Sequence, residues 1–206
     1  MSEHRHENET SRQPVAVVET SSRHRGLSRL RLAVVVFANG FFGIGLLAAL
    51  ALGLRLPMVF PSLGPTAFWL FFSPESRTAC PRNTLFGHAV GILCGYGALW
   101  LTGLQDAPSA IIEGVSLARV FAAALSLALT GALMILFDAV HSPAGATTLI
   151  VSLGIITHPA RLVIIELAVA AIVAQACLVN RLRGIPYPLW APGSDFGGNS
   201  AVHIKP

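Results

Sequence analysis

Two short segments of the chain match each other and carry residue types suited to binding an anion. They cover residues 61–68 and 142–149, and their glycine and threonine match in register, 81 residues apart. A pair of hydrophobic segments interrupted by Gly and Pro in corresponding halves of a chain is typical of binding sites built between repeats of a membrane protein. The repeat therefore predicts a polar site between two halves of one domain.

The chemistry of these segments is that of helix starts. Proline at the start of a helix removes an amide that would lack a partner, glycine lets a ligand approach the backbone, and hydroxyls cap free amides. Because the N-terminus of a helix also carries partial positive charge, the pattern predicts an anion site at the amides near Gly64 and Gly145. The hydroxyls would come from Ser62, Thr66, Thr147 and Thr148. In the alternative interpretation, Pro and Gly only kink two packed helices.

Two histidines lie close to the repeated segments. His141 precedes the second segment and follows Asp138 by three residues, while His88 lies in the third apolar segment. Ionisable residues inside a membrane are functional candidates, and histidine can supply a positive charge near neutral pH. A structural hydrogen bond is the preferred interpretation for His88, and a direct role for His141.

A metal site formed by these two histidines and Asp138 is the alternative, and it would make the protein a membrane-embedded metal-handling protein or enzyme. The spacing of the three residues is not a known ligand signature, so we expect neither a metal nor another cofactor.

Four further polar residues lie at or inside apolar segments. Arg82 and Asn83 begin the third segment. Arg82 either anchors the topology or attracts anions to the cavity, and both residues belong to the candidate site. Arg119 and Glu166 lie inside their segments, where an unpaired charge is costly, so we expect them to pair with each other.

The composition indicates an integral membrane protein. The chain is 53% hydrophobic and 12% charged, against about 25% charged residues in soluble domains. Residues 32–54 and 83–105 carry no charge, and each run is long enough to span a membrane. The net charge of +4 comes largely from Arg beside apolar runs, so we expect no nucleic-acid partner. The three cysteines show no CxxC spacing and predict neither a disulfide framework nor a zinc site.

Apolar segments define the expected architecture, an all-α transmembrane bundle. About four full spans and two short or broken segments are expected, arranged as two inverted repeats over about residues 31–105 and 114–183. The six segments are 32–54, 57–73, 83–105, 116–137, 143–157 and 162–180. Three glycines four residues apart, Gly87, Gly91 and Gly95, predict close helix packing.

The distribution of arginines favours six crossings with both termini in the cytoplasm. The expected location is the inner membrane of a bacterium or an equivalent membrane. The alternative is that the two short segments re-enter on one side. Residues 1–28 are predicted to be a disordered cytoplasmic tail, 29–184 the transmembrane domain, and 185–206 a flexible tail. The bilayer is the expected surrounding, and a homodimer is a reasonable assembly for so thin a bundle.

Four motifs together resemble the HPP family of small integral membrane proteins. They are Phe60–Ala67, Ser73–Ser76, Pro81–Asn83 followed by Gly87-His88, and His141–Thr147. The resemblance covers about residues 30–182. The chain departs from the His-Pro-Pro motif of the family at Ser142, which stands in place of the first proline, frees one amide and adds a hydroxyl.

The resemblance implies about four spanning helices and a role in transport. Members of the family have been linked to nitrite movement across chloroplast and cyanobacterial membranes. The residues at the matching site positions are His141, Pro143, Gly145 and Thr147, together with Arg82, Asn83 and His88. We therefore expect a transporter or channel for a small inorganic anion such as nitrite, and not an enzyme.

Overall fold

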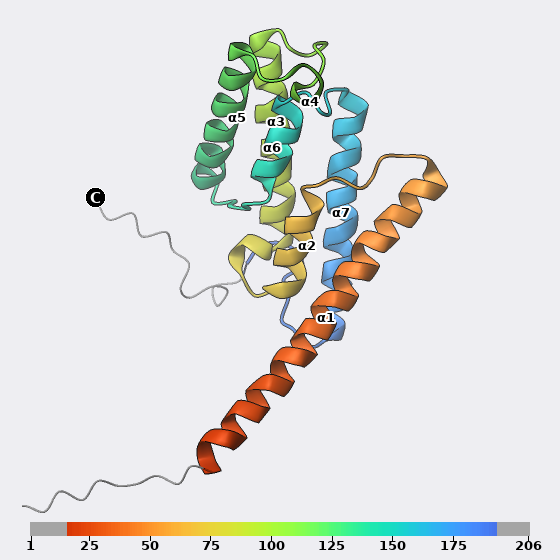
Figure 1. Cartoon of the computed structure of the whole chain (residues 1–206), viewed down its shortest axis with the longest axis vertical. Helices are drawn as coiled ribbons and strands as arrows, with labels where there is room; N and C mark the ends of the chain where they lie inside the picture. The colour runs from red at the N-terminus through yellow and green to blue at the C-terminus, as the bar shows by residue number, and fades with distance from the viewer. Residues whose placement is uncertain (1–15, 193–206) are drawn as a thin grey trace, which may run out of the picture. The chain divides into compact units, whose positions relative to one another are not determined.

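A computed structural model describes residues 16–192, and every regular element in that range is helical (Figure 1). The chain divides into two units at Phe37, and all contacts discussed below lie within the second. The α-helices are α1 (Ala16–Leu54), α2 (Leu63–Phe72), α3 (Pro81–Thr102), α4 (Ala110–Glu113), α5 (Leu117–Leu136), α6 (Ala144–Ser152) and α7 (Pro159–Leu182), and a 3-10 helix, η1, covers Arg77–Ala79.

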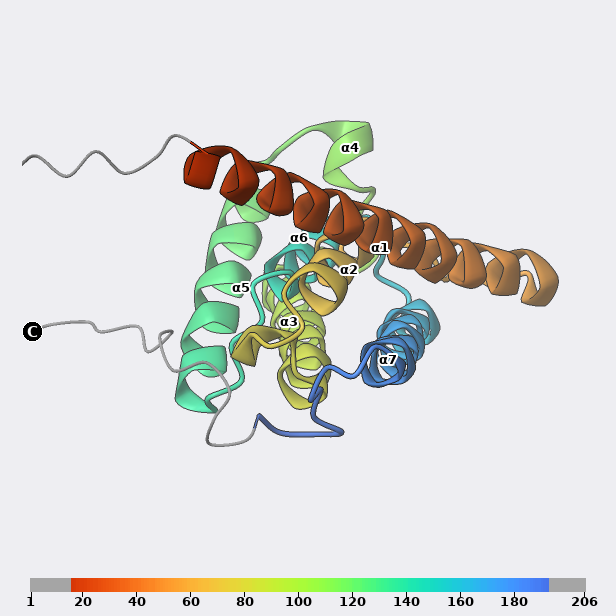
Figure 2. The same ribbon diagram turned by 90° about the horizontal axis from the view of Figure 1, so that it is seen from below.

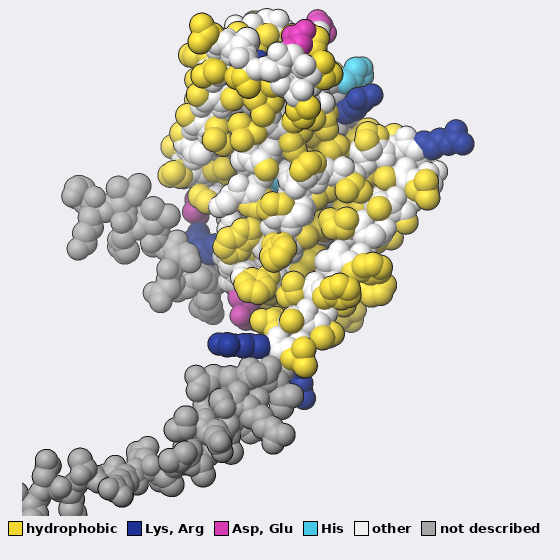
Figure 3. All heavy atoms as spheres, viewed as in Figure 1, with side chains coloured by type: hydrophobic (Ala, Val, Ile, Leu, Met, Phe, Trp, Pro, Cys, Tyr) yellow, Lys and Arg dark blue, Asp and Glu magenta, His cyan; other side chains and the backbone are white. Residues whose placement is uncertain are grey.

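The expected four full spans and two short segments are confirmed. The helices long and apolar enough to cross a membrane are Arg29–Leu54 within α1, α3, α5 and α7. By contrast, α2 has 10 residues and α6 has 9, about half of what a span requires. Hydrophobic side chains cover most of the visible face (Figure 3), and on α5 Leu117 is 89% exposed, as expected for a surface that meets lipid.

Local sequence signals explain where the helices begin and end. Pro81 occupies the first turn of α3, and Gly103 closes it in the left-handed conformation with φ 66°. The short helix α2 ends at Phe72, and its C-cap Ser73 stands directly before Pro74, since a proline disfavours helical backbone in the residue preceding it. The other short helix, α6, is followed by Gly154 with φ 75°, which turns the chain away.

The structure corrects both predicted tails. Helix α1 begins at Ala16, so residues 16–28 are helical and not disordered, because extending a helix avoids the cost of nucleating one. At the other end Tyr187 is buried and its hydroxyl donates to the carbonyl of Ala79, so this part of the predicted flexible tail is fixed. Burial raises the pKa of Tyr187 well above its ordinary value, which keeps the hydroxyl a donor. Residues 1–15 and 193–206 lie outside the described range.

The two short helices run in opposite directions. Following the colours of Figure 1, the chain descends through α2 and ascends through α6, and their N-terminal ends approach each other. Helix α3 packs against α5, α6 and α7, while α2 packs against α7. Figure 2 shows α3 between α5 and α7. The opposed short helices agree with inverted halves, although the inverted repeat itself stays a prediction.

The prediction of close packing along the glycines of α3 is confirmed. A Cβ atom at Gly91 would lie 2.8 Å from the carbonyl oxygen of Ala144, and one at Gly95 would lie 2.8 Å from Cβ of Val151. A Cβ atom at Gly87 would lie 2.8 Å from Cβ of His141, in the turn before α6. The missing side chains let α3 and α6 lie backbone against backbone, and this contact fixes the height of α6 along α3.

We expect Gly91→Ala to lower the melting temperature of the protein in detergent. The added methyl group collides with a backbone carbonyl, and overpacking of this kind costs about 1–3 kcal/mol. Gly97→Ala is the matched control, because a Cβ there meets nothing within 4 Å. Both changes gain about 1 kcal/mol of helix propensity, so the control should be neutral or stabilised. Equal melting temperatures for the two variants would contradict the packing argument.

Candidate functional site

A cluster of buried polar side chains lies where α2 and α6 begin. Its members are fully buried, and the turns before α2 and α6 supply them together with the helices α2, α3 and α6. They are Ser62, Thr66, His88, His141 and Thr147. All five were predicted to be site residues, and the fold brings them together from positions up to 85 residues apart in the sequence.

His88 of α3 is the centre of this cluster. Its Nε2 atom lies 2.9 Å from Oγ1 of Thr66 on α2, and its Nδ1 atom lies 2.7 Å from Oγ1 of Thr147 on α6. Thr66 and Thr147 are the two threonines that match in the repeated segments. The repeat in the sequence thus becomes a matched pair of hydrogen bonds on the two sides of one imidazole ring.

The hydroxyl groups determine where the protons of His88 lie. The Oγ1 atom of Thr66 donates its single hydrogen to the carbonyl of Ser62 at 2.9 Å, so it can only accept from His88. Consequently Nε2 of His88 carries a hydrogen, and Nδ1 accepts from the hydroxyl of Thr147. Both nitrogens of a neutral His88 are therefore satisfied.

His141 is held differently and keeps one basic nitrogen without a donor. Its Nδ1 atom lies 2.7 Å from the carbonyl oxygen of Thr78, which can only accept, so Nδ1 carries the hydrogen. The other nitrogen, Nε2, lies 3.4 Å from Oγ1 of Thr66, whose hydrogen already goes to Ser62. The ring centroids of His141 and His88 are 5.2 Å apart. Nε2 of His141 is thus the atom of the cluster best placed to accept a proton.

A second buried contact adjoins the cluster. The Oγ1 atoms of Thr148 and Thr130 are 3.0 Å apart, joining α6 to α5. Thr148 was predicted as a site residue, but Thr130 was missed. Its signal in the sequence is the spacing of Ser126 and Thr130, two hydroxyls four residues apart on one face of an otherwise apolar helix. Gly145 lies one turn earlier on α6 and faces Leu127 of α5.

The predicted site of free backbone amides is not formed. Near the start of α2, Gly64 N–H donates to the carbonyl of Pro61, at 3.4 Å. On α6, Ala144 and Gly145 N–H donate to the carbonyls of the residues three positions earlier. Each short helix is entered through a tight turn that uses these amides. Side chains, and not amides, therefore present the polar groups of the site.

The side chains of Arg82 and Asn83 form their hydrogen bonds with groups other than the histidines. The guanidinium of Arg82 donates to the carbonyls of Phe137 and Asp138, where it caps the end of α5. The side-chain amide of Asn83 donates to the carbonyl of Arg77 and holds the turn before α3. These contacts hold the start of α3 against the end of α5 and against the turn before α3.

The alternative metal site is not assembled. Asp138 lies beyond the end of α5 with a positive φ of 48°, and its carboxylate pairs with Arg77 at 2.8 Å on the surface. Since α5 stops at Leu136, Asp138 does not lie one helical turn from His141 as the sequence predicted. Within residues 29–192, no three His, Cys, Asp or Glu side chains are grouped closely enough to hold a metal.

The predicted pair of Arg119 and Glu166 is wrong. Arg119 donates to backbone carbonyls, and one carboxylate oxygen of Glu166 is buried with no hydrogen-bond partner among the described residues. The two residues lie on α5 and α7, which α3 separates (Figure 2).

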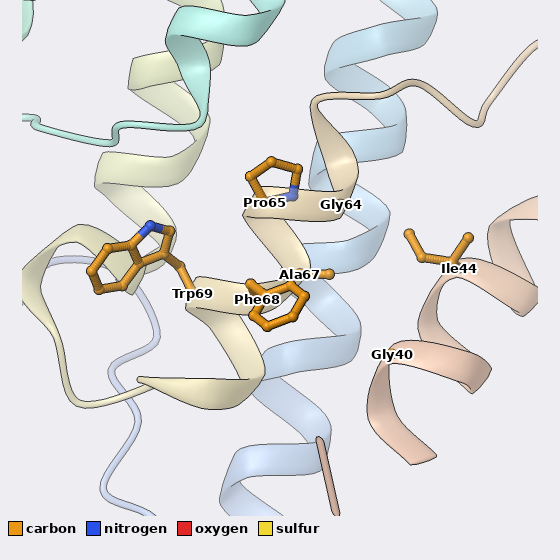
Figure 4. A pocket seen from close by; sticks show the side chains of 7 residues that line it. All are labelled: Gly40, Ile44, Gly64, Pro65, Ala67, Phe68 and Trp69. Carbon is orange, nitrogen blue, oxygen red and sulfur yellow. The ribbon is translucent and has the colours of Figure 1, made fainter. Parts of the chain in front are cut away.

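Gly64 lines an apolar groove between α1 and α2 with a volume of about 580 Å³ (Figure 4). Ala67 points toward α1, where Gly40 and Ile44 lie, while Phe68 and Trp69 project from α2. Thr66 does not line this groove, so Gly64 lines a different surface of α2 from the one that bonds His88, and its role as a site residue stays a prediction.

Comparison with known proteins agrees with this architecture. The model of the family described as HPP, transmembrane region, matches residues 26–188. The chain belongs to the HPP family. The suspected resemblance is therefore confirmed, and with it a multi-pass membrane protein. No curated protein and no solved structure shows a significant match to the chain.

We expect Thr147→Val to lower the stability of this HPP-family protein by about 1–3 kcal/mol, because it leaves a buried nitrogen of His88 without a partner. Thr102→Val is the matched control, since that hydroxyl is only partly buried and donates to its own helix. Chemical unfolding in detergent measures both. An equal loss of stability in the two variants would show that the bond to His88 is not the reason.

Proposed function

We propose that this HPP-family protein is a transporter or channel for a small inorganic anion, with nitrite as the first candidate, and not an enzyme. The observation that supports this most strongly is the buried cluster in which His88 joins the starts of two opposed short helices. Polar residues and broken helices are costly in a membrane and occur where they line a path for solutes. Packing alone does not require two histidines there.

The chemistry of the cluster favours an anion over a cation. Hydroxyl and imidazole groups form it, and within residues 29–192 no carboxylate takes part in its hydrogen bonds. Asp138, the nearest acidic residue in sequence, is paired with Arg77 on the surface. A cation would meet no opposite charge at His88, whereas a protonated histidine would attract an anion.

Protonation of His141 gives the site its charge. A proton on Nε2 would point toward Oγ1 of Thr66, which can still accept a hydrogen bond. The resulting cation lies beside His88 at the meeting point of α2 and α6. An anion entering with this proton would be neutralised at the site, which removes most of the cost of placing it in the membrane.

We also propose that both termini are cytoplasmic and that the protein lies in the bacterial inner membrane. Arg77 lies before α3, Arg82 in its first turn and Arg181 in the last turn of α7, so one end of the bundle carries these arginines. The opposite end carries the acidic loop between α3 and α5, with Asp106 and Glu113. The positive-inside rule places the arginines in the cytoplasm.

Uptake by liposomes tests the proposal. Vesicles containing the protein should take up nitrite faster than empty vesicles, and the difference should grow as the pH is lowered, because the proposed mechanism needs a proton on His141. Empty vesicles at each pH measure the leak of free nitrous acid through the lipid. Equal uptake by the two preparations at every pH would refute transport of nitrite.

Substitution of the histidines separates the site from the scaffold. His141→Gln should reduce uptake at least about tenfold and remove its pH dependence, because Gln cannot take a proton. His158→Gln is the matched control, since His158 is exposed at the start of α7. A His141→Gln protein that melts like the wild type and transports at the same rate would exclude this role.

A further inference from the structure

Arg119 is buried at the other end of the α5–α6 contact. Only 3% of its surface is exposed. Its guanidinium donates to the carbonyl of Ser152 at 3.3 Å, and to the carbonyls of Ala107 at 3.3 Å and Pro108 at 2.8 Å. These bonds hold a positive charge between the end of α6 and the loop that follows α3.

No carboxylate neutralises this charge. Among residues 29–192 the single ion pair joins Arg77 to Asp138, far along the chain. Asp106 lies in the same loop, directly before Ala107, but it is exposed and forms no ion pair with Arg119. The carbonyls and the C-terminal end of α6 supply only partial negative charge. The hydrogen bonds within the described range use three of the five N–H donors of the guanidinium.

Ser152 supplies a second polar group without a partner. It is fully buried, and its Oγ atom forms no hydrogen bond with any described residue. An unpartnered buried hydroxyl costs free energy, and such groups call for an explanation. Gly154 makes room for the arginine, because a Cβ at that position would lie 2.6 Å from Nη2 of Arg119. The guanidinium is thus received by the backbone at the end of α6, and the unpartnered hydroxyl belongs to the residue whose carbonyl accepts from it.

The interface between α5 and α6 also contains the residues that adjoin the histidine cluster. Polar residues occupy three of the five buried positions on α5, which are Arg119, Ala122, Ser126, Thr130 and Met134. Thr130 meets Thr148 of α6, and Thr147 beside it bonds His88. Hydroxyls at helix contacts often serve only as hydrogen-bonding glue. That explanation fails for Ser152, whose hydroxyl bonds nothing in the described chain.

We infer that Arg119 and Ser152 form a second anion-binding site, which takes a small monovalent oxyanion of the nitrite class. The free N–H groups of Arg119 and the hydroxyl of Ser152 donate to the oxygens of the anion, and the unneutralised guanidinium supplies the charge. This inference rests on the proposed function in one respect only, which is the identity of the anion. The transported anion would have a second binding site at the far end of the α5–α6 contact.

Thermal unfolding of the purified protein in detergent tests the site. Sodium nitrite is titrated at constant ionic strength against sodium gluconate, whose anion is too bulky for a buried site. Nitrite should raise the melting temperature of the wild type, because a ligand stabilises the state that binds it. Ser152→Ala should weaken the apparent affinity about tenfold by removing a donor to a charged ligand.

The variant Ser152→Ala should also fold at least as well as the wild type without nitrite, because its hydroxyl has no partner to lose. Ser126→Ala is the matched control, as it removes a buried serine hydroxyl of α5 that donates to the carbonyl of Ala123. We expect this control to melt at a lower temperature and to keep the full response to nitrite.

The outcomes distinguish the two proposals. An equal response to nitrite in the wild type and Ser152→Ala, or no response in the wild type, overturns the second site even if liposomes take up nitrite. A response that Ser152→Ala loses and Ser126→Ala keeps supports the site even if uptake fails, in which case only the transport proposal falls.

Discussion

The two hydrogen bonds of His88 are the constraint on which the centre of this molecule depends. One bond reaches α2 through Thr66 and the other reaches α6 through Thr147. Neither short helix is long enough to span a membrane or stable enough to stand alone, so each needs a partner for its buried polar end. The imidazole ring supplies both partners at once and couples the positions of the two helices.

The glycines of α3 make this bridge possible. Because Gly87 and Gly91 carry no side chains, α6 and the turn before it approach α3 closely enough for His141 to lie beside His88. At the opposite ends, polar side chains hold the last carbonyls of the short helices. Asn180 of α7 donates to Leu70 of α2, and Arg119 of α5 donates to Ser152 of α6. Each short helix is therefore fixed at both ends by its neighbours.

The proposed transport chemistry follows from what the cluster contains. Hydroxyls and imidazoles donate or accept hydrogen bonds without a permanent charge, so the resting site is neutral. A proton on His141 changes that balance, and the uncompensated charge of Arg119 provides a second point of attraction for an anion. The two proposed sites would thereby present one charge that is fixed and one that depends on pH.

The sequence by itself determined the membrane class, the four long spans, the two short helices and the matched threonines, because hydropathy and the positions of Pro and Gly are local properties. It also named all five members of the cluster, but it missed Thr130 beside it. Only the tertiary structure decided which groups meet: it showed that tight turns use the amides near Gly64 and Gly145, that Asp138 turns away to Arg77, and that Arg119 binds carbonyls and not Glu166. These outcomes depend on contacts between distant segments, which no local pattern encodes.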